Sequence, residues 1–317
     1  MVKQTTDTNF ESTVLAVTAE KYIPKLTQNI FNYNAALVKI NEKSSVNFTR
    51  SGDEVIVPIL LGKNNNTKAY APYEAFDLTP QKGIVDAAAK IRDYAAPIVI
   101  SDNELRINSG KEQIVSIMSA KLMQADESLK QRMNLHMYDD GTADGGKALL
   151  GLKAMCEESG TPGAYMGITD ATNWINQYQT GSAGQLLSKM GALYYSQKDG
   201  GDAPDLILCD DKFAILYEAA NQSTSGVGIQ YVDAKLADAG FTHISYRGVP
   251  MVNDKSLTAS VGKAYFLNSK YLGFLFENPE TTEFVRMPNQ LAKSAFLKCS
   301  TQLITSRRNR QGVVVLS

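Results

Sequence analysis

The longest regular pattern of apolar positions lies between residues 110 and 138. Apolar residues recur there in steps of three and four, which places them along one face of an α-helix. Charged residues occupy the positions between them, so the opposite face is predicted to be solvated and balanced in charge. At ~1.5 Å per residue this helix, which we call the spine helix, is roughly 43 Å long and other segments must lie along it. The apolar positions are Ile114, Met118, Leu122, Ala125, Leu129, Met133 and Met137.

A second pattern, typical of β-strands, precedes the spine helix. The run 54–61 is largely apolar but contains Pro58, which predicts an edge or bulged strand. Apolar and polar residues then largely alternate over 85–92, and a period of two predicts a half-buried strand. The polar, turn-rich segment 62–82 between these strands is predicted to be the tip of a long hairpin. Loops of this length are uncommon in compact domains and are usually functional.

The remaining segments complete the pattern. Residues 1–45 are predicted to form an arm, whose first helix Pro24 breaks or kinks and whose second helix is short. A glycine-rich stretch, 140–167, follows the spine helix, and helices and strands mix in the second half. Two last strands, 295–306 and 312–316, flank a basic turn, so we predict an α+β protein. The other predicted helices are 185–197 and 212–221, and the other strands are 205–209, 243–246, 249–253, 264–268 and 271–276.

Composition sets the broad class of the protein. The chain has 317 residues, 44% hydrophobic and 21% charged, as expected for a soluble protein with one large domain or two ordinary ones. Its net charge of −1 gives no global sign of nucleic-acid binding. The polar start has no apolar signal segment, and no apolar run is long enough for a membrane span. Three widely spaced cysteines, Cys156, Cys209 and Cys299, indicate free thiols in a reducing cytoplasm.

The segment 141–148 nearly matches a phosphate-binding P-loop, with a glycine, four residues, a second glycine and Lys147. Ala148 replaces the hydroxyl residue that would bind Mg²⁺, and a long helix precedes the segment where the motif needs a strand. A glycine-rich turn after a helix is therefore the favoured interpretation.

No other catalytic or metal-binding pattern is present in the sequence. The two histidines, His136 and His243, fall in different predicted elements and have no neighbours at ligand spacing. The aspartates between 199 and 211 do not follow the order of a calcium-binding loop and are predicted to be turn and cap residues. No nucleophile motif occurs. We therefore predict a protein without a catalytic site, cofactor or metal.

The chain ends in a locally basic segment. Residues 286–317 contain six basic residues and no acidic one. Such residues can form a solvated strand edge that discourages unwanted pairing. They can equally form a patch that faces phosphate or an acidic neighbour. Both interpretations remain open from the sequence. The residues are Arg286, Lys293, Lys298, Arg307, Arg308 and Arg310.

The order of these parts carries a family resemblance. The extended hairpin, the segment Ala-Pro-Ile-Val-Ile-Ser at 96–101 and the spine helix follow one another. The spine helix leaves through the glycine-rich segment 138–152, then 167–174 contains the only tryptophan, and two strands close the chain between 297 and 316. Over nearly its whole length the chain resembles HK97-fold major capsid proteins of tailed double-stranded DNA phages, and the glycine pattern is the most specific part.

The resemblance implies a division of the chain into the parts of that fold. The N-arm would be 1–45 and the E-loop 46–93. The P-domain would comprise the spine helix within 94–164 and the C-terminal strands 291–317. The A-domain would be 165–290.

The resemblance also implies a function. Copies of the chain would form pentamers and hexamers that tile an icosahedral shell around the phage DNA, assembled in the host bacterial cytoplasm and retained in the virion. DNA would be held by weak, non-specific contacts, and no membrane would be involved. The implied partners are a separate scaffolding protein, a portal and a possible decoration protein. An encapsulin-type shell that carries cargo is the alternative within the fold, and a nucleotide-binding enzyme is the alternative outside it.

Two sets of residues are candidates for contacts in such a shell. In the first, the tip of the E-loop would touch a neighbouring subunit. No acceptor asparagine or catalytic glutamate can be matched to its lysines for a covalent cross-link. In the second, basic residues would face the lumen or a neighbouring subunit. The first set is Lys63, Asn65, Lys68, Tyr70 and Tyr73, and the second is Lys293, Lys298, Arg307, Arg308 and Arg310.

Overall fold

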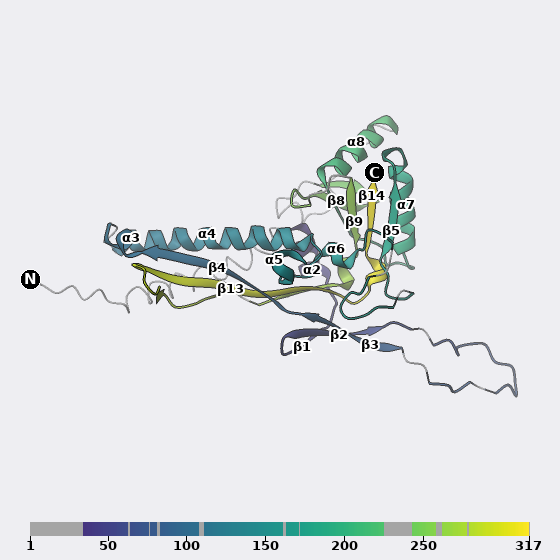
Figure 1. The fold of residues 1–317 in the computed structure, drawn as a ribbon. Coiled ribbons are helices and arrows are strands. Elements are labelled where there is room, and N and C mark those ends of the chain that lie inside the picture. Colours follow the sequence, from purple (N-terminus) through teal and green to yellow (C-terminus); the bar gives the residue numbers. More distant parts are fainter. Residues whose placement is uncertain are drawn as a thin grey trace, which may run out of the picture.

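The computed structural model has three connected parts, a long helix-and-ribbon platform, a sheet domain and a projecting hairpin (Figure 1). Most of the predicted N-arm, residues 1–33, lies outside the described residues, whereas its second helix is α2 (Ala35–Lys43). The structure describes residues 34–62, 64–75, 77–80, 83–107, 111–160, 163–170, 172–224, 243–257, 262–277 and 279–316.

The spine helix is α4 (Lys111–Met137), close to its predicted bounds. It lies along an antiparallel ribbon of β4 (Arg92–Ser101) and β13 (Ala292–Thr305) (Figure 1). The predicted apolar positions of α4 from Met118 onward are buried against this ribbon and the base of the sheet domain. The prediction of a fully solvated opposite face is wrong, because Asp126 and Lys130 are buried and form an ion pair within the subunit.

A capping box formed by Ser101 and Glu104 lies where β4 ends and the next helix begins. The Ser101 hydroxyl accepts from the Glu104 backbone N–H at 3.2 Å, and the Glu104 carboxylate accepts from the Ser101 N–H at 3.0 Å. This reciprocal pattern satisfies two backbone N–H groups that would otherwise lack a partner at the start of α3 (Asp102–Ile107).

The hairpin consists of β1 (Thr49–Ser51), β2 (Glu54–Leu60) and β3 (Ile84–Lys90). β1 pairs with β2 only as far as Ile56, so Pro58 lies where β2 is paired on its β3 side alone. β2 is the middle strand of its sheet, but at Pro58 it forms a local edge, where proline is tolerated, so the predicted edge character holds only for this part of the strand. The hairpin is anchored at its base, where the Ala88 N–H donates to the Met166 carbonyl at 3.0 Å.

The sheet domain is a six-stranded mixed sheet in the order β5-β14-β9-β6-β8-β7. α7 (Leu186–Gln197) and α8 (Asp211–Thr224) pack on one face of it through a separate apolar cluster. β5 was not predicted, because its sequence Gln-Tyr-Gln-Thr-Gly is neither apolar nor alternating. The strands are β5 (Gln177–Gly181), β6 (Leu206–Cys209), β7 (His243–Tyr246), β8 (Val249–Asn253), β9 (Lys263–Leu267) and β14 (Gly312–Leu316).

The last two strands belong to different sheets, which differs from the expected grouping of 291–317 with the spine helix. β13 pairs with β4, whereas β14 crosses into the sheet domain and lies between β5 and β9. The chain end therefore ties platform and sheet domain together. β13 also pairs with β10 (Leu272–Phe276), β11 (Glu280–Thr281) and β12 (Val285–Arg286).

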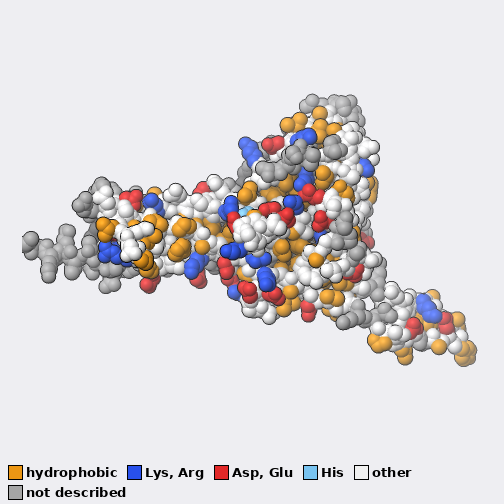
Figure 2. Space-filling model, viewed as in Figure 1, with side chains coloured by type: hydrophobic (Ala, Val, Ile, Leu, Met, Phe, Trp, Pro, Cys, Tyr) orange, Lys and Arg blue, Asp and Glu red, His pale blue; other side chains and the backbone are white. Residues whose placement is uncertain are grey.

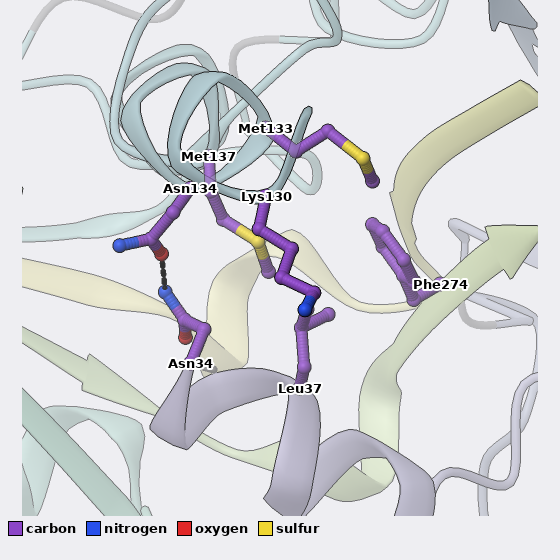
Figure 3. A pocket seen from close by; sticks show the side chains of 7 residues that line it. All are labelled: Asn34, Leu37, Lys130, Met133, Asn134, Met137 and Phe274. Atoms are coloured by element: carbon purple, nitrogen blue, oxygen red, sulfur yellow. Dashed lines mark hydrogen bonds between the residues drawn. The ribbon is translucent and has the colours of Figure 1, made fainter. Parts of the chain in front are cut away.

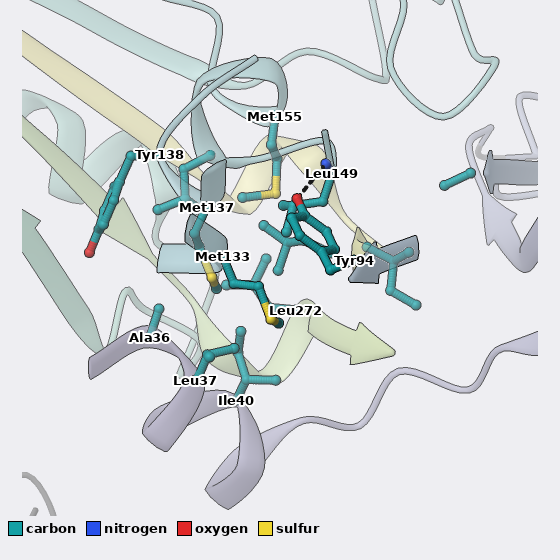
Figure 4. Packing of buried hydrophobic residues seen from close by; sticks show 14 of the residues in the cluster. Ala36, Leu37, Ile40, Tyr94, Met133, Met137, Tyr138, Leu149, Met155 and Leu272 are labelled. Atoms are coloured by element: carbon teal, nitrogen blue, oxygen red, sulfur yellow. Dashed lines mark hydrogen bonds between the residues drawn. The ribbon is translucent and has the colours of Figure 1, made fainter. Parts of the chain in front are cut away.

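One continuous core lies where the three parts meet. Side chains from α2, β4, the end of α4 and β10 converge there (Figure 4). Tyr94 lies at its centre, where its hydroxyl accepts from the Leu149 backbone N–H at 3.1 Å. Among the described residues, no helix combines the length and apolar character needed to cross a membrane.

Candidate functional site

The loop at the end of the hairpin, residues 61–83, is called the tip loop below, and it projects away from the rest of the molecule (Figure 1). Asn65 and Lys68 are exposed, Tyr70 is half-buried, and the Tyr73 side chain is fully exposed. Lys63 lies outside the described residues. The contact of these residues with a neighbouring subunit stays a prediction.

Polar side chains hold the tip loop in shape. The Lys68 ammonium donates to Glu74 Oε1 at 2.6 Å, while Glu74 Oε2 accepts from the Ala71 N–H at 3.1 Å. These bonds, with Lys68 contributing most, hold the pKa of the Glu74 carboxyl below its ordinary value. Across the loop, the Asn66 amide donates to the Thr79 carbonyl at 3.1 Å. The loop is thus braced without an apolar core.

The face of the β4–β13 ribbon that points away from α4 exposes large apolar side chains. Buried and exposed residues alternate along β4 and over 295–299 of β13, and Phe296 lies directly opposite Pro97 in the register. Phe296 is 41% exposed and Val99 is 42% exposed. Lys298, one of the predicted contact residues, is exposed on the same face. We call Pro97, Val99, Phe296 and Lys298 the ribbon face.

The three arginines of the basic turn have different roles. Arg308 is fully buried, and its guanidinium donates to the carbonyls of Met155 at 2.8 Å and Gly163 at 2.7 Å. Burial lowers the pKa of Arg308 from its ordinary value. Arg310 is also buried, and it donates to the Gln197 carbonyl at 2.8 Å.

The prediction that the three arginines act together as a surface contact is therefore wrong for two of them. Arg308 and Arg310 are used inside their own subunit, which the basic character of the turn could not reveal. Arg307 alone is exposed, 5.1 Å above the Tyr271 ring. Lys293 is half-buried on β13.

The glycine-rich segment after the spine helix forms a turn, as favoured from the sequence. A four-residue helix, α5 (Ala143–Gly146), directly follows α4 with no strand before it. Asp144 and Gly145 have positive φ angles of 53° and 70°, which break the helical path. Arg132 of α4 pairs with Asp144, which fastens the turn to the spine helix. Lys147 is exposed, and the strand–loop–helix context of a P-loop is missing around it.

His136 is a buried structural histidine. Its Nδ1 lies 2.9 Å from the Tyr94 hydroxyl, and its Nε2 lies 3.5 Å from the Asp144 carboxylate. Burial lowers the pKa of His136, so the ring is neutral near pH 7. His243 lies on β7 in the sheet domain. Within the described part of the chain, no group of His, Cys, Asp and Glu side chains could hold a metal ion.

A small cavity lies between α2, α4 and β10 (Figure 3). Its free interior of about 10 Å³ has room for roughly one water molecule. The Asn34 and Asn134 amides bond to each other, and the Lys130 ammonium pairs with Asp126, so its polar groups are engaged. These side chains provide no nucleophile, and none of them is placed to act as a general base. The lining residues are Asn34, Leu37, Lys130, Met133, Asn134, Met137 and Phe274.

The visible surface mixes charges of both signs. Figure 2 shows Lys and Arg interspersed with Asp and Glu over the centre of the molecule, beside apolar patches on the platform and hairpin. Ion pairs such as Lys153 with Asp140 and Lys270 with Asp202 also join charges of opposite sign within the subunit. No broad basic face is present on this side of the described molecule.

Comparisons with known proteins identify the fold. No protein-family model and no curated protein sequence matches the chain. The cyanophage A-1(L) capsid subunit is similar with a TM-score of 0.66 and 15% identity, over 89% of this chain and 92% of that chain. A capsid subunit of a GTA particle gives 0.54 and 13%, over 90% and 91%. The capsid subunit of the myovirus XM1 gives 0.53 and 11%, over 84% and 86%. The predicted α+β, HK97-like capsid fold is thus confirmed.

Proposed function

We propose that the chain is the major capsid protein of a tailed double-stranded DNA bacteriophage, and that its copies form pentamers and hexamers in a closed icosahedral shell. The observation that carries the proposal is the fold, shared with phage capsid subunits over nearly the full length of both chains. Assembly would take place in the host bacterial cytoplasm, and the shell would become part of the virion. The fold of these neighbours points to a structural rather than an enzymatic role.

Exposed apolar side chains support assembly. Leu60, Tyr73, Leu78 and Ile84 on the hairpin are each at least two-thirds exposed. The platform exposes Phe296 and further apolar residues on the ribbon face. Leu60 and Ile84 lie directly opposite each other on β2 and β3, and large apolar side chains gathered on a surface mark interaction sites in soluble proteins. A shell of identical subunits would cover both surfaces.

The charge distribution supports weak contact with packaged DNA. Genome release requires that the inner wall does not bind DNA tightly, and the near-zero net charge fits this requirement. Lys293, Lys298 and Arg307 would face the lumen or an acidic neighbour. A separate scaffolding protein, a portal and possibly a decoration protein would complete the particle.

Electron microscopy of the purified protein, alone and with a co-expressed scaffolding protein, tests the proposal. We expect closed particles, and DNA inside particles isolated from infected cells. Only monomers or dimers at all salt and protein concentrations would refute the capsid function. If native particles hold an enzyme and no nucleic acid, the protein is an encapsulin-type shell protein and not a phage capsid protein.

Nucleotide calorimetry tests whether the turn after the spine helix binds phosphate. Because the Mg²⁺-binding hydroxyl and the preceding strand are missing, no binding of ATP with Mg²⁺ is expected. A Mg²⁺-dependent affinity that Lys147→Ala abolishes would show that the subunit has a nucleotide site after all.

A further inference from the structure

An arginine on the surface of the sheet domain lies over three tyrosine rings. The guanidinium carbon of Arg247 is 4.7 Å from the centre of the Tyr195 ring. It is 5.5 Å from the centres of the Tyr194 and Tyr246 rings. Tyr194 and Tyr195 belong to α7, whereas Tyr246 ends β7 and Arg247 follows it in the turn to β8. Arg247 is exposed and Tyr195 is 61% exposed, so another molecule can reach this group.

The tyrosine rings are fixed by the core beneath them. Tyr246 is buried and meets Phe266 edge-on, with the ring centres 6.3 Å apart. Tyr194 in turn meets Tyr246 edge-on at 6.4 Å. The Tyr217 hydroxyl of α8 donates to the Ser245 carbonyl at 3.0 Å and so holds the end of β7. The guanidinium of Arg247 therefore lies on an ordered aromatic surface before a partner arrives, which lowers the entropy cost of binding.

Arg247 has donors left over for a ligand. The described side chains that raise its pKa are tyrosines, first of all Tyr195, whose hydroxyl accepts from the guanidinium, and no described carboxylate pairs with it. Arg286, which is also exposed, by contrast pairs with Asp102 of its own subunit at 3.1 Å. Stacking on rings uses the faces of a guanidinium, while its five N–H groups point outward from its edge. A carboxylate can accept two parallel hydrogen bonds from such an edge.

The backbone of Arg247 is strained for its residue type. Arg247 and Gly248 form the two-residue turn between β7 and β8, with φ angles of 52° and 80°. Both angles lie in the left-handed region, which bulky residues rarely adopt and which asparagine followed by glycine favours in such turns. An arginine at this position costs stability that an asparagine would not cost. Strain of this kind leads to the hypothesis that the side chain serves a function.

The exposed face of α7 continues the site beside Arg247. Leu187, Gly191 and Tyr195 follow one another in steps of four, so they lie on one face of the helix. A Cβ atom added to Gly191 would lie 3.7 Å from the Tyr246 hydroxyl and 3.8 Å from Arg247 Nη2, which is ordinary contact. Alanine would therefore fit and favour the helix, so the subunit itself does not require this glycine. Close approach of another backbone does require it. α7 lies on the side of the sheet domain that is turned away from the platform (Figure 1).

The spacing and charge of this face favour one kind of partner. Leu187 lies one helical turn, ~6 Å, from Gly191, and two residues four apart on a second helix have the same separation. A nucleic acid would need several basic side chains for its phosphates. Lys189, the one lysine within α7, instead lies against Gly181 of β5. A single guanidinium beside an apolar side chain fits one carboxylate and one apolar residue of a protein helix.

We propose that Arg247, Gly191 and Leu187 form a docking site for an acidic helix of another protein. A carboxylate of that helix pairs with Arg247, an apolar side chain one turn away packs on Leu187, and the two backbones approach at Gly191. Tyr195 positions the guanidinium and covers one end of the contact. The inference goes beyond the proposed capsid function and holds for the separate subunit as well as for a shell.

Fluorescence anisotropy with a defined probe tests the site. The probe is a labelled, alanine-based helical peptide that carries one leucine and one glutamate four residues apart, made in both orders. We expect saturable binding of one order to the purified protein with a Kd below about 1 mM. The same peptide with glutamine in place of glutamate should bind about tenfold more weakly, because the charge-assisted pair is lost.

Variants of the protein separate a binding role from a structural one. Arg247→Asn should weaken binding of the probe at least about tenfold, yet unfold at the same or a higher urea concentration than the wild type, because asparagine relieves the strained turn. Arg247→Lys keeps the charge without the paired donors and should bind with intermediate affinity. Leu187→Ser should also weaken binding. The control Arg307→Asn changes an exposed arginine outside the site and should bind the probe like the wild type.

Four results would overturn the inference. They are no binding of the probe in either order, equal binding of the glutamate and glutamine peptides, and lower stability of Arg247→Asn with unchanged binding. The fourth is a loss of self-association in Arg247→Asn, seen by sedimentation, which would assign the surface to a second copy. An Arg247-dependent affinity for a thymidine oligonucleotide in place of the peptide would likewise refute an acidic helix. Formation of closed particles is measured separately, so the capsid function and this docking site can fail independently.

Discussion

Two long irregular segments of this chain are stabilised differently, one by polar contacts at the surface and one by packing in the core. The tip loop has no apolar core, exposes its large side chains and is braced by pairs such as Lys68 with Glu74. The segment 149–176, which we call the buried loop, packs Leu152, Tyr165 and Trp174 into the main core. The guanidinium of Arg308, which lies between β13 and β14, donates hydrogen bonds to backbone carbonyls of this loop.

The difference shows that length and irregularity alone do not identify a contact loop. A loop rich in apolar side chains can pack on its own subunit, and its stability then belongs to that subunit. A loop with only polar bracing adds little to the stability of its own subunit, so we expect it to find its packing partner on another molecule. Changes in the buried loop should therefore affect folding, and changes in the tip loop should affect assembly.

The largest expected effect is that of Arg308→Met. The substitution removes the donor to the buried carbonyl of Met155 and to the half-buried carbonyl of Gly163, and each unsatisfied buried group costs ~1–3 kcal/mol. We expect the free energy of unfolding to fall by about 3–5 kcal/mol, measured by urea denaturation. The matched control is Arg307→Met in the exposed neighbour, which should change stability by about 0.5 kcal/mol or less. Equal effects of the two variants would contradict the separate roles of these arginines.

The next effect is that of Gly151→Ala, at the start of the buried loop. A Cβ atom here would lie 2.4 Å from the His136 carbonyl oxygen and 2.5 Å from that of Met137, at the end of the spine helix. Backbone must move to relieve this overlap, so we expect a loss of roughly 2–3 kcal/mol in thermal or urea unfolding. Gly184→Ala, where the added methyl meets open space, is the control and should be nearly neutral. A stable, well-folded Gly151→Ala subunit would show that the buried loop is looser than its packing indicates.

A smaller, pH-dependent effect is expected at His136, which joins the spine helix to the turn before the buried loop. Its pKa is lowered in the folded state by burial, while an unfolded histidine titrates near ~6.5. As pH falls through that range, the unfolded chain binds a proton that the folded chain does not, so the free energy of unfolding decreases. This loss continues until the pH reaches the lowered pKa of the folded state. His136→Gln should therefore lose less stability between pH 7.5 and pH 5 than the wild type, and an unchanged slope would assign the titration elsewhere.

Much of the fold could be predicted from the sequence, and the features that could not be predicted depend on long-range contacts. The spine helix, the hairpin and most strands follow from local periodicity and turn chemistry. The sheet to which each strand belongs does not follow from local patterns. β13 and β14 lie in different sheets because of long-range pairing. The candidate residues Asn65, Lys68, Tyr70 and Tyr73 do lie on the projecting loop, while their contact with a neighbouring subunit stays a prediction. Arg308 was misassigned, since a buried arginine satisfied by backbone carbonyls leaves no mark in the sequence.

The smallest effect on the subunit, and the sharpest test of the comparison, comes from deleting residues 63–75 of the tip loop. This segment has no buried apolar side chain among its described residues, so it adds nothing to the core of its own subunit. We expect the thermal midpoint of the purified subunit to match that of the wild type, while closed particles no longer form.

Lys68→Met is the milder companion variant to that deletion. It removes an exposed ion pair that contributes little to folding but holds Glu74 and, through the turn, Tyr73. Its subunit should unfold like the wild type and assemble at a higher threshold concentration. If the deletion instead abolishes the cooperative thermal transition, the tip loop packs on its own subunit. The tip loop and the buried loop would then not differ in the way proposed.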